Sequence, residues 1–186
     1  MRIISGEARG RRLFAPSGEE TRPTADRIRE SLFNILGQHV RDARVLDLFG
    51  GSGAMSLEAL SRGAAYAIIS DHSRIAVQCI ERNAKLVLSS QYSEKLRILR
   101  ADYRAALDRI QLEQFDLVFL DPPYRMTDAY TTALRQLHGR KLLRSGCICV
   151  LERDSAVTLP LPDGFVCFDS RNYGTTSIDF LKEAVE

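Results

Sequence analysis

The sequence has no tryptophan, and only four cysteines and three histidines occur among its 186 residues. The cysteines form no C-x-x-C pair and the histidines are scattered, so a zinc-binding signature is missing. We therefore expect no metal site. The four cysteines, which we expect to be reduced and mostly buried, are Cys79, Cys147, Cys149 and Cys167.

Long apolar runs are also missing. No run approaches the ~20 residues that a membrane span needs, and the opening MRIISGEARGRRLF lacks the apolar stretch of a secretory signal. Apolar residues make up 45% of the chain and charged residues 27%, which is typical of a globular protein with a substantial core. We expect a cytoplasmic protein without a membrane partner.

A large excess of one sign of charge is also missing, because the formal net charge is only +2. Of the 26 basic residues four are lysine, so 22 are arginine. Residues 1–16 carry four of these arginines (Arg2, Arg9, Arg11 and Arg12) against a single acid. From the residues alone this cluster is either a solvated basic face or a contact for phosphates.

The first residues, RIISGEARGRRLFAP, predict two short strands around a glycine-containing turn. A helix should follow from about Thr24 and end at Gly37, because its apolar residues recur at helical spacing. Apolar runs at 44–49, 65–70, 96–99, 115–120 and 147–152 then alternate with helical stretches near 54–62, 73–88, 103–111 and 128–139.

This alternation predicts an α/β fold with a mostly parallel sheet between two layers of helices. The tail, GFVCFDSRNYGTTSIDFL, predicts an antiparallel hairpin at one edge of the sheet. We divide the chain into a small N-terminal β arm, residues 1–23, and one α/β domain, residues 24–186.

The loop DLFGGSGAMS links the first of these strands to a helix. Its glycines leave backbone N–H groups bare at the start of the helix, where a ligand can approach them. The dinucleotide pattern G-x-G-x-x-G is not met, because Ser56 stands at the third glycine position. A nicotinamide-dependent oxidoreductase is therefore disfavoured, and a tight turn without a ligand remains the alternative.

Acidic residues follow the next strands. Asp71 ends the second strand, 18 residues after Gly53, close to where an acid in a doubly wound sheet binds ribose hydroxyls. Asp102 follows the third strand and can cap a helix, contact a ligand, or do both. Asp121 ends the fourth. The carboxyl ends of parallel strands share one edge, so we predict a nucleoside site there.

The segment LVFLDPPYRM, which reaches that edge, indicates the type of reaction. Pro122 and Pro123 lack N–H donors, so the strand must end at Asp121. Tyr124 offers a flat face for a planar base, and Asp121 accepts hydrogen bonds. Such acceptors favour the nucleophilic form of a base amine. The arrangement predicts methyl transfer from a sulfonium donor to an exocyclic amine.

The motifs DLFGGSG, SDHS, RAD and FLDPPY, in this order, resemble those of class I S-adenosylmethionine-dependent methyltransferases that modify exocyclic amines of nucleic-acid bases. MRIISGEARGRRLFAP, TRPTADRIRESLFNILG and RNYGTTSIDFL resemble the bacterial 16S ribosomal RNA guanine-N2 methyltransferase (small-subunit methyltransferase D) family across nearly the whole chain. The resemblance implies a Rossmann-like, seven-stranded, mostly parallel sheet with helices on both faces.

The resemblance also implies site residues. The cofactor-binding set is Asp47, Gly51, Ser52, Gly53, Asp71, Asp102, Thr24, Arg27 and Glu30. Within it, Asp71 would bind the ribose and Asp102 the adenine amine, whereas Arg27 and Glu30 are equally placed to form an i, i+3 pair. The residues that would receive the target guanine are Asp121, Pro122, Pro123 and Tyr124. The arginines assigned to RNA, those of the arm on a protruding hairpin, are Arg9, Arg11, Arg12 and Arg22.

Two positions depart from the family pattern. Gly50 stands where alanine is more common, which should loosen the loop, and Asp71 replaces a commoner glutamate. Neither change removes a required group.

The implied activity is methyl transfer from S-adenosylmethionine to the N2 amine of a guanine in 16S ribosomal RNA, by a monomer acting on the assembled small subunit. The alternatives are an N6-adenine methyltransferase of DNA or RNA, which shares the D-P-P-Y tetrad, and a non-catalytic RNA-binding module.

Overall fold

The computed structural model describes residues 1–16, 23–123 and 125–184. Its strands are β1 (Arg44–Asp47), β2 (Tyr66–Asp71), β3 (Leu96–Arg100), β4 (Phe115–Leu120), β5 (Leu143–Asp154), β6 (Phe165–Tyr173) and β7 (Thr176–Glu183). Its helices are α1 (Pro23–Leu36), α2 (Ala54–Ser61), α3 (Arg74–Leu88), α4 (Tyr92–Lys95), α5 (Tyr103–Arg109) and α6 (Asp128–Gly139), with 3-10 turns at Gly37–Val40 and Ser89–Gln91.

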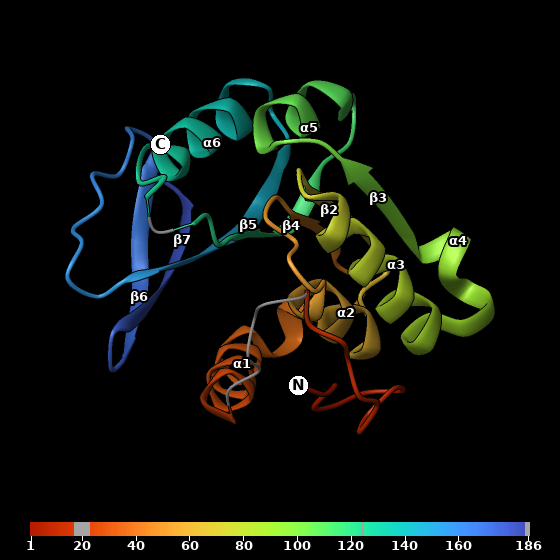
Figure 1. Ribbon diagram of the computed structural model, residues 1–186. Coiled ribbons are helices and arrows are strands. Elements are labelled where there is room, and N and C mark those ends of the chain that lie inside the picture. The colour runs from red at the N-terminus through yellow and green to blue at the C-terminus, as the bar shows by residue number, and fades with distance from the viewer. Residues whose placement is uncertain (17–22, 124, 185–186) are drawn as a thin grey trace.

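The strands form one seven-stranded sheet in the order β3-β2-β1-β4-β5-β7-β6 (Figure 1). β1 to β5 run parallel, whereas β7 is antiparallel to β5 and to β6. The predicted parallel sheet with an antiparallel terminal hairpin is therefore confirmed. The order reverses between β1 and β4, so their carboxyl ends flank the crevice where open α/β sheets bind ligands.

Helices cover both faces of the sheet, with α1, α2 and α3 on one side and α5 and α6 on the other (Figure 1). Alternation along β4 divides its side chains between two cores: Leu117 and Phe119 face the first group of helices, and Val118 and Leu120 the second. Such a strand, apolar on both faces, is what a parallel sheet between helical layers requires.

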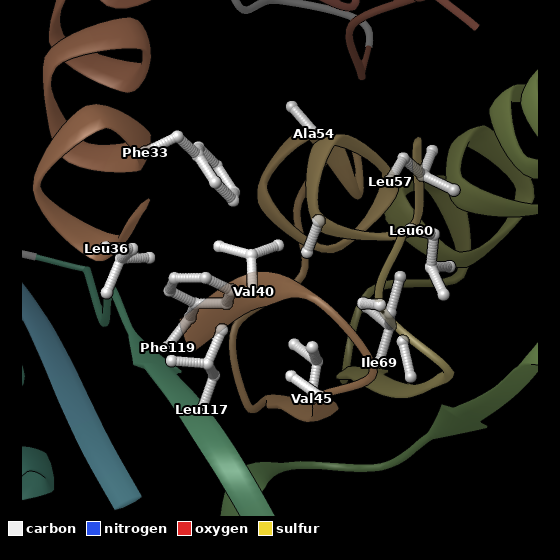
Figure 2. Packing of buried hydrophobic residues seen from close by; sticks show 14 of the residues in the cluster. Phe33, Leu36, Val40, Val45, Ala54, Leu57, Leu60, Ile69, Leu117 and Phe119 are labelled. Carbon is white, nitrogen blue, oxygen red and sulfur yellow. The ribbon is translucent and has the colours of Figure 1, made fainter. Parts of the chain in front are cut away.

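Figure 2 shows the core beneath α1 and α2. Phe33 of α1 points at Phe119 of β4, with ring centroids 6.1 Å apart, and Leu57 of α2 lies on the same side of the sheet. Phe33 and Leu57 are at most 1% exposed, and burial of such a side chain contributes roughly 1.5–3 kcal/mol. This packing holds α1 over the strand ends that carry the predicted site.

The N-terminal arm was predicted over residues 1–23, of which 17–22 lie outside the described residues; its described part, residues 1–16, differs from the prediction. It contains one isolated antiparallel bridge, Arg2 with Arg12, instead of two short strands. It also does not protrude, because Ile3, Ala8 and Leu13 are buried in the core that contains α2 and α3. Backbone bonds do cross the arm, from Ile3 to Arg11 and from Leu13 to Met1. Four other arm amides donate to side chains of α2 and α3: those of Ile4, Ser5, Ala8 and Phe14.

The β6–β7 hairpin joins the sheet through polar contacts as well as its ladder. Arg153 of β5 forms a two-bonded ion pair with Asp179 of β7, with the shorter N–O distance 2.6 Å. Tyr173, at the end of β6, lies 2.6 Å from the hydroxyl of Ser31 in α1. Two of the segments that resemble the family, TRPTADRIRESLFNILG and RNYGTTSIDFL, are therefore in contact through Ser31 and Tyr173.

Three of the cysteines are buried and Cys167 is exposed, and all four are free thiols. In residues 1–16, 23–123 and 125–184 no cluster of three histidine, cysteine, aspartate or glutamate side chains is suited to a metal ion. No helix in these same residues is long and apolar enough to cross a membrane.

Candidate active site

The ends of β1, β2 and β3 bring Asp47, Asp71 and Asp102 to one edge of the sheet. Asp47 and Asp71 are the last residues of their strands, and Asp102 follows β3 by two residues. The parallel registers of β1 with β2 and of β2 with β3 place the three ends at the same edge. The structure thus brings together the acids that the sequence predicted to share a site.

The glycine loop, residues 48–53, runs from β1 to the first turn of α2. Gly51 and Gly53 have left-handed φ angles of +54° and +78°, which glycine adopts without steric cost. A Cβ on Gly51 would meet none of the described atoms within 4 Å, so the loop faces open space at that position. The loop therefore has both the bare backbone and the room that a ligand requires.

Gly50 has a different role in the same loop. A Cβ there would lie 2.3 Å from Cγ2 of Ile69 and 2.9 Å from Cδ1 of Ile80. The Gly50 amide donates to the carbonyl of Ser70 at 2.8 Å, which holds the loop against β2. Glycine at this position therefore allows the loop to pack closely against β2 and α3.

Asp71 supports the glycine loop directly. Its Oδ2 accepts from the Gly51 amide at 2.9 Å and its Oδ1 from the Ser73 amide at 2.8 Å. A carboxylate has about four acceptor positions, so two remain for ligand hydroxyls. The ribose role of Asp71 stays a prediction, and the loop-bracing role is visible in the structure.

Asp47 lies beneath the loop and is only 4% exposed. Its Oδ2 accepts from the Ser56 hydroxyl at 3.1 Å and its Oδ1 from the Phe49 amide at 3.3 Å. Burial raises the pKa of Asp47 from 3.8 to about 7; the bonds to Ser56 and Phe49 oppose this shift, and the nearby charge of Asp71 adds to it. These contacts position the loop, while a direct contact of Asp47 with a cofactor remains a prediction.

Asp102 caps α5. Its Oδ1 accepts from the amides of Arg104 and Ala105 at 2.9 and 3.0 Å, which confirms the capping alternative. Both bonds use one oxygen, so the other can still accept from a ligand amine. The next residue, Tyr103, packs against Phe49 of the glycine loop with ring centroids 5.4 Å apart. Among the described residues the buried Tyr103 hydroxyl has no hydrogen-bond partner.

The D-P-P segment follows β4 at the same edge. Asp121 and Pro123 are exposed, whereas Pro122 is buried. The Pro123 carbonyl accepts from the Met126 amide at 2.7 Å, so the chain turns directly after the prolines. Tyr124, the predicted stacking residue, lies outside the described residues.

Glu152 is a candidate site residue that the sequence did not indicate. The pairing of β4 with β5 ends at Leu120 with Leu151, so Asp121 and Glu152 are the residues that follow this last pair on two neighbouring strands. Alternation along β5 places Glu152 on the face that α1 covers. Burial raises the pKa of the Glu152 carboxyl. Its position in CICVLE, one residue past an apolar run, was the available signal.

The helix α1 gives a mixed result for the predicted residues. Arg27 and Glu30 are exposed, and within the described residues no ion pair joins them. The i, i+3 pair is instead Asp26 with Arg29, at 2.9 Å. The side chain of Thr24 and the whole of Arg22 lie outside the described residues.

A second missed residue, Glu58 of α2, organises the region behind the loop. It is fully buried and accepts from the amides of Ile4 and Ser5 in the arm, at 2.8 and 3.0 Å. It also pairs with Arg62 at 2.7 Å and lies 3.8 Å from Arg29 of α1. One carboxylate thus ties the arm, α1 and α2 together. Its partners in the arm are more than 50 residues away in the sequence, so no local pattern could reveal them.

Asn83 of α3 performs a similar task at the glycine loop. Its Oδ1 accepts from the Phe14 amide at 2.8 Å, and its Nδ2 donates to the carbonyls of Phe14 and Ser52, each at 2.9 Å. The predicted loop residue Ser52 is therefore held by its backbone.

The arm arginines Arg9, Arg11 and Arg12 are exposed, as a contact with RNA would need.

Comparison with known proteins decides the family. The sequence pattern of the family described as Conserved hypothetical protein 95 matches residues 1–182. The chain belongs to this family. Relatives of the chain include proteins named ribosomal RNA small subunit methyltransferase D, and the predicted family resemblance is confirmed.

Individual relatives of this family match the chain over most of its length. YlbH of Bacillus subtilis, provisionally named an rRNA methyltransferase, is 35% identical over 98% of this chain and 99% of its own. Ribosomal RNA small subunit methyltransferase D of Haemophilus influenzae is 30% identical over 95% of this chain and 91% of its own. The solved structure of Escherichia coli yhhF, provisionally described as a methyltransferase, has a TM-score of 0.83 at 30% identity, covering 100% and 99% of the two chains. The fold is the class I methyltransferase fold.

Proposed function

We propose that this protein transfers a methyl group from S-adenosylmethionine to the exocyclic N2 amine of a guanine in the 16S ribosomal RNA of the small subunit. The observation that carries the proposal is the placement of Asp121 and its two prolines at the same sheet edge as the glycine loop and Asp71. The names of relatives that match most of the chain support ribosomal RNA as the substrate class.

The described residues fit the cofactor. The loop is open in front of Gly51, and Asp71 keeps acceptor positions that suit two ribose hydroxyls. The second oxygen of Asp102 suits an adenine amine, and the half-buried ring of Phe49 offers an apolar face for the base. When bound, S-adenosylmethionine supplies a methyl group on a positively charged sulfur, which is an electrophile that needs no further activation.

The remaining residues act on the guanine. Asp121 accepts a hydrogen bond from the guanine amine or the ring N–H, which favours the nucleophilic form of the amine as positive charge develops on it. The buried Pro122 fixes the backbone after β4, so the position of Asp121 is set before the base arrives. Tyr124 is proposed to stack on the base.

Two substitutions test the roles of the acids. Asp121→Ala should abolish most turnover on small-subunit RNA, while the affinity for S-adenosylmethionine measured by calorimetry stays within about twofold, because Asp121 touches the base and not the donor. Asp71→Ala should instead weaken cofactor binding. Unchanged turnover in the first variant, or unchanged affinity in the second, would remove the corresponding role.

Nucleoside mass spectrometry of the reacted nucleic acid identifies the modified base. N2-methylguanosine is expected, whereas N6-methyladenine would assign the D-P-P-Y tetrad to the adenine alternative. If the protein binds RNA but transfers no methyl group to it, the alternative of a non-catalytic RNA-binding module is favoured.

The form of the substrate needs a separate measurement. Incubation with naked 16S RNA and with assembled small subunits, at equal RNA concentration, should show preferential methylation of the assembled subunit. We also propose that the enzyme acts as a monomer in the cytoplasm, and sedimentation of the active protein tests the first point.

A further inference from the structure

A hollow lies on the surface where the arm packs against α3, on the side of the sheet that carries α1 and α2. Its volume is about 730 Å³, and it is lined by Arg11, Arg12, Phe14, Gln78, Glu81, Arg82, Lys85 and Leu86. We call this the arm groove. It is built from residues of the first 16 positions and of α3, and it contains none of the acids of the candidate active site.

The arm groove is strongly basic for a chain so nearly neutral. Four of its residues are cationic and one is acidic, an excess of three positive charges (4 − 1), whereas the whole chain has +2. Within the described residues no ion pair is formed by Arg11, Arg12, Arg82 or Lys85. Elsewhere arginines such as Arg62 and Arg153 are paired with carboxylates at 2.6–2.7 Å.

The wall of the arm groove is rigidly held. The guanidinium carbon of Arg82 lies 3.2 Å from the centroid of the Phe14 ring, a close cation–π contact. The backbone of Phe14 is fixed by two hydrogen bonds to Asn83, whose amide also donates to Ser52 of the glycine loop. Arg82 and the backbone of Phe14 are therefore held in place before a partner binds, which reduces the entropy that is lost at this part of the groove on binding.

We propose that the arm groove binds the phosphate backbone of the RNA substrate, at a distance from the methylated base. This proposal rests on the proposed function, because it places a second part of the same substrate. Unpaired arginines and lysines gathered in a hollow attract a polyanion by charge and by hydrogen bonds to phosphate oxygens. Arg82 already covers a face of Phe14, so the groove is suited to contact the backbone more than to stack bases.

Such contacts carry no base readout; they fix the orientation of the RNA on the protein. The arm and α3 enter the same hydrogen-bond network as the glycine loop through Asn83. A strand held in the groove is thus anchored to the part of the fold that also holds the cofactor loop. The α3 residues Arg82 and Lys85 extend the basic surface beyond the arm arginines that the sequence indicated.

The test replaces Arg82→Gln and Lys85→Gln together in the full chain. The affinity for small-subunit RNA, measured by filter binding, should fall at least about fivefold in low salt. The slope of log affinity against log salt should shrink by about 1.4, which corresponds to two lost phosphate contacts on a single strand. The charge-retaining pair Arg82→Lys with Lys85→Arg should bind like the wild type.

A matched control removes the same charge from the opposite face. Arg135→Gln with Lys141→Gln changes two exposed residues in and after α6, and should leave the RNA affinity and salt slope unchanged. Equal losses in the control and the groove variant would overturn the proposal, as would an unaltered salt slope in the groove variant. Loss of affinity for assembled subunits but not for naked RNA would assign the groove to an acidic protein surface and would also overturn it.

The same experiment separates this proposal from the proposed function. If the wild type methylates the RNA and the groove variant binds it unchanged, only the groove assignment fails. If the wild type methylates no RNA and yet the groove variant loses RNA affinity and salt dependence as expected, only the proposed reaction fails.

Discussion

Replacing Asp47 with asparagine should make the stability of the protein less dependent on pH. Asp47 is buried beneath the glycine loop, and burial raises its pKa from 3.8 to about 7. The folded protein therefore holds a proton there that the unfolded chain releases. Stability must then fall as the pH rises between these two values, because the unfolded state binds fewer protons.

The size of the effect follows from the two pKa values. Each pH unit between the two pKa values lowers the free energy of unfolding by about 1.4 kcal/mol, and by less close to either pKa. The contribution of Asp47 between pH 5 and pH 8 is therefore a loss of about 2–3 kcal/mol. Well below pH 4 both states are protonated, and well above pH 7 both are ionised, so the loss is confined to the range around and between these two pKa values. Asparagine keeps an acceptor for the Phe49 amide or the Ser56 hydroxyl but does not titrate.

Urea denaturation at pH 5, 6, 7 and 8 measures the effect. The stability of Asp47→Asn relative to the wild type should rise by about 2–3 kcal/mol across this series, with unchanged m-values. Asp163→Asn, which removes an exposed carboxylate, is the control and should show no such trend. A difference between Asp47→Asn and the wild type that is the same at pH 5 and pH 8 would refute the reasoning.

Three further substitutions examine the surroundings of the site. Gly50→Ala forces a methyl group against Ile69, so thermal denaturation should show a loss of about 1–3 kcal/mol, and a fully stable variant would contradict the packing. Glu58→Gln removes the carboxylate that pairs with the half-buried Arg62 and lies near the buried Arg29, and it should cost about 3 kcal/mol in urea denaturation; a loss below about 1 kcal/mol would argue against its role. Glu152→Gln, beside Asp121, should lower kcat roughly tenfold to a hundredfold while cofactor affinity by calorimetry is retained, and an unaltered kcat would exclude a positioning role.

The parts of the fold that the sequence predicted are those with a local signal. Apolar runs such as FDLVFL, separated by helical periods, locate a parallel strand because both of its faces are buried. The acids Asp71 and Asp102 were found because each follows such a run, and parallel strands end at one edge. β5 begins at Leu143 and not at 147. Its first four residues are mostly exposed and this part pairs irregularly with β4, so the apolar run marks only the later part of the strand.

The parts that the sequence did not predict depend on contacts between distant residues. Glu58 and Asn83 look like ordinary helix residues, yet each binds the arm across more than 50 positions of the chain. The arm was therefore expected to protrude, when its backbone is in fact bonded to α2 and α3. Glu152 could not be predicted as a neighbour of Asp121, because their proximity depends on the register of β4 with β5.

The hydrogen bonds of the arm also bear on the order in which the protein assembles during synthesis. The first 16 residues are made before Glu58, Ser61 and Asn83, the side chains that satisfy their backbone. Until α3 has been synthesised, the Ser52 carbonyl lacks its donor, and of these bonds the glycine loop has only those to β2. A nascent chain ending before residue 83 would therefore contain the glycine motif without the hydrogen bond that completes the loop, so the loop is finished only once α3 has been made.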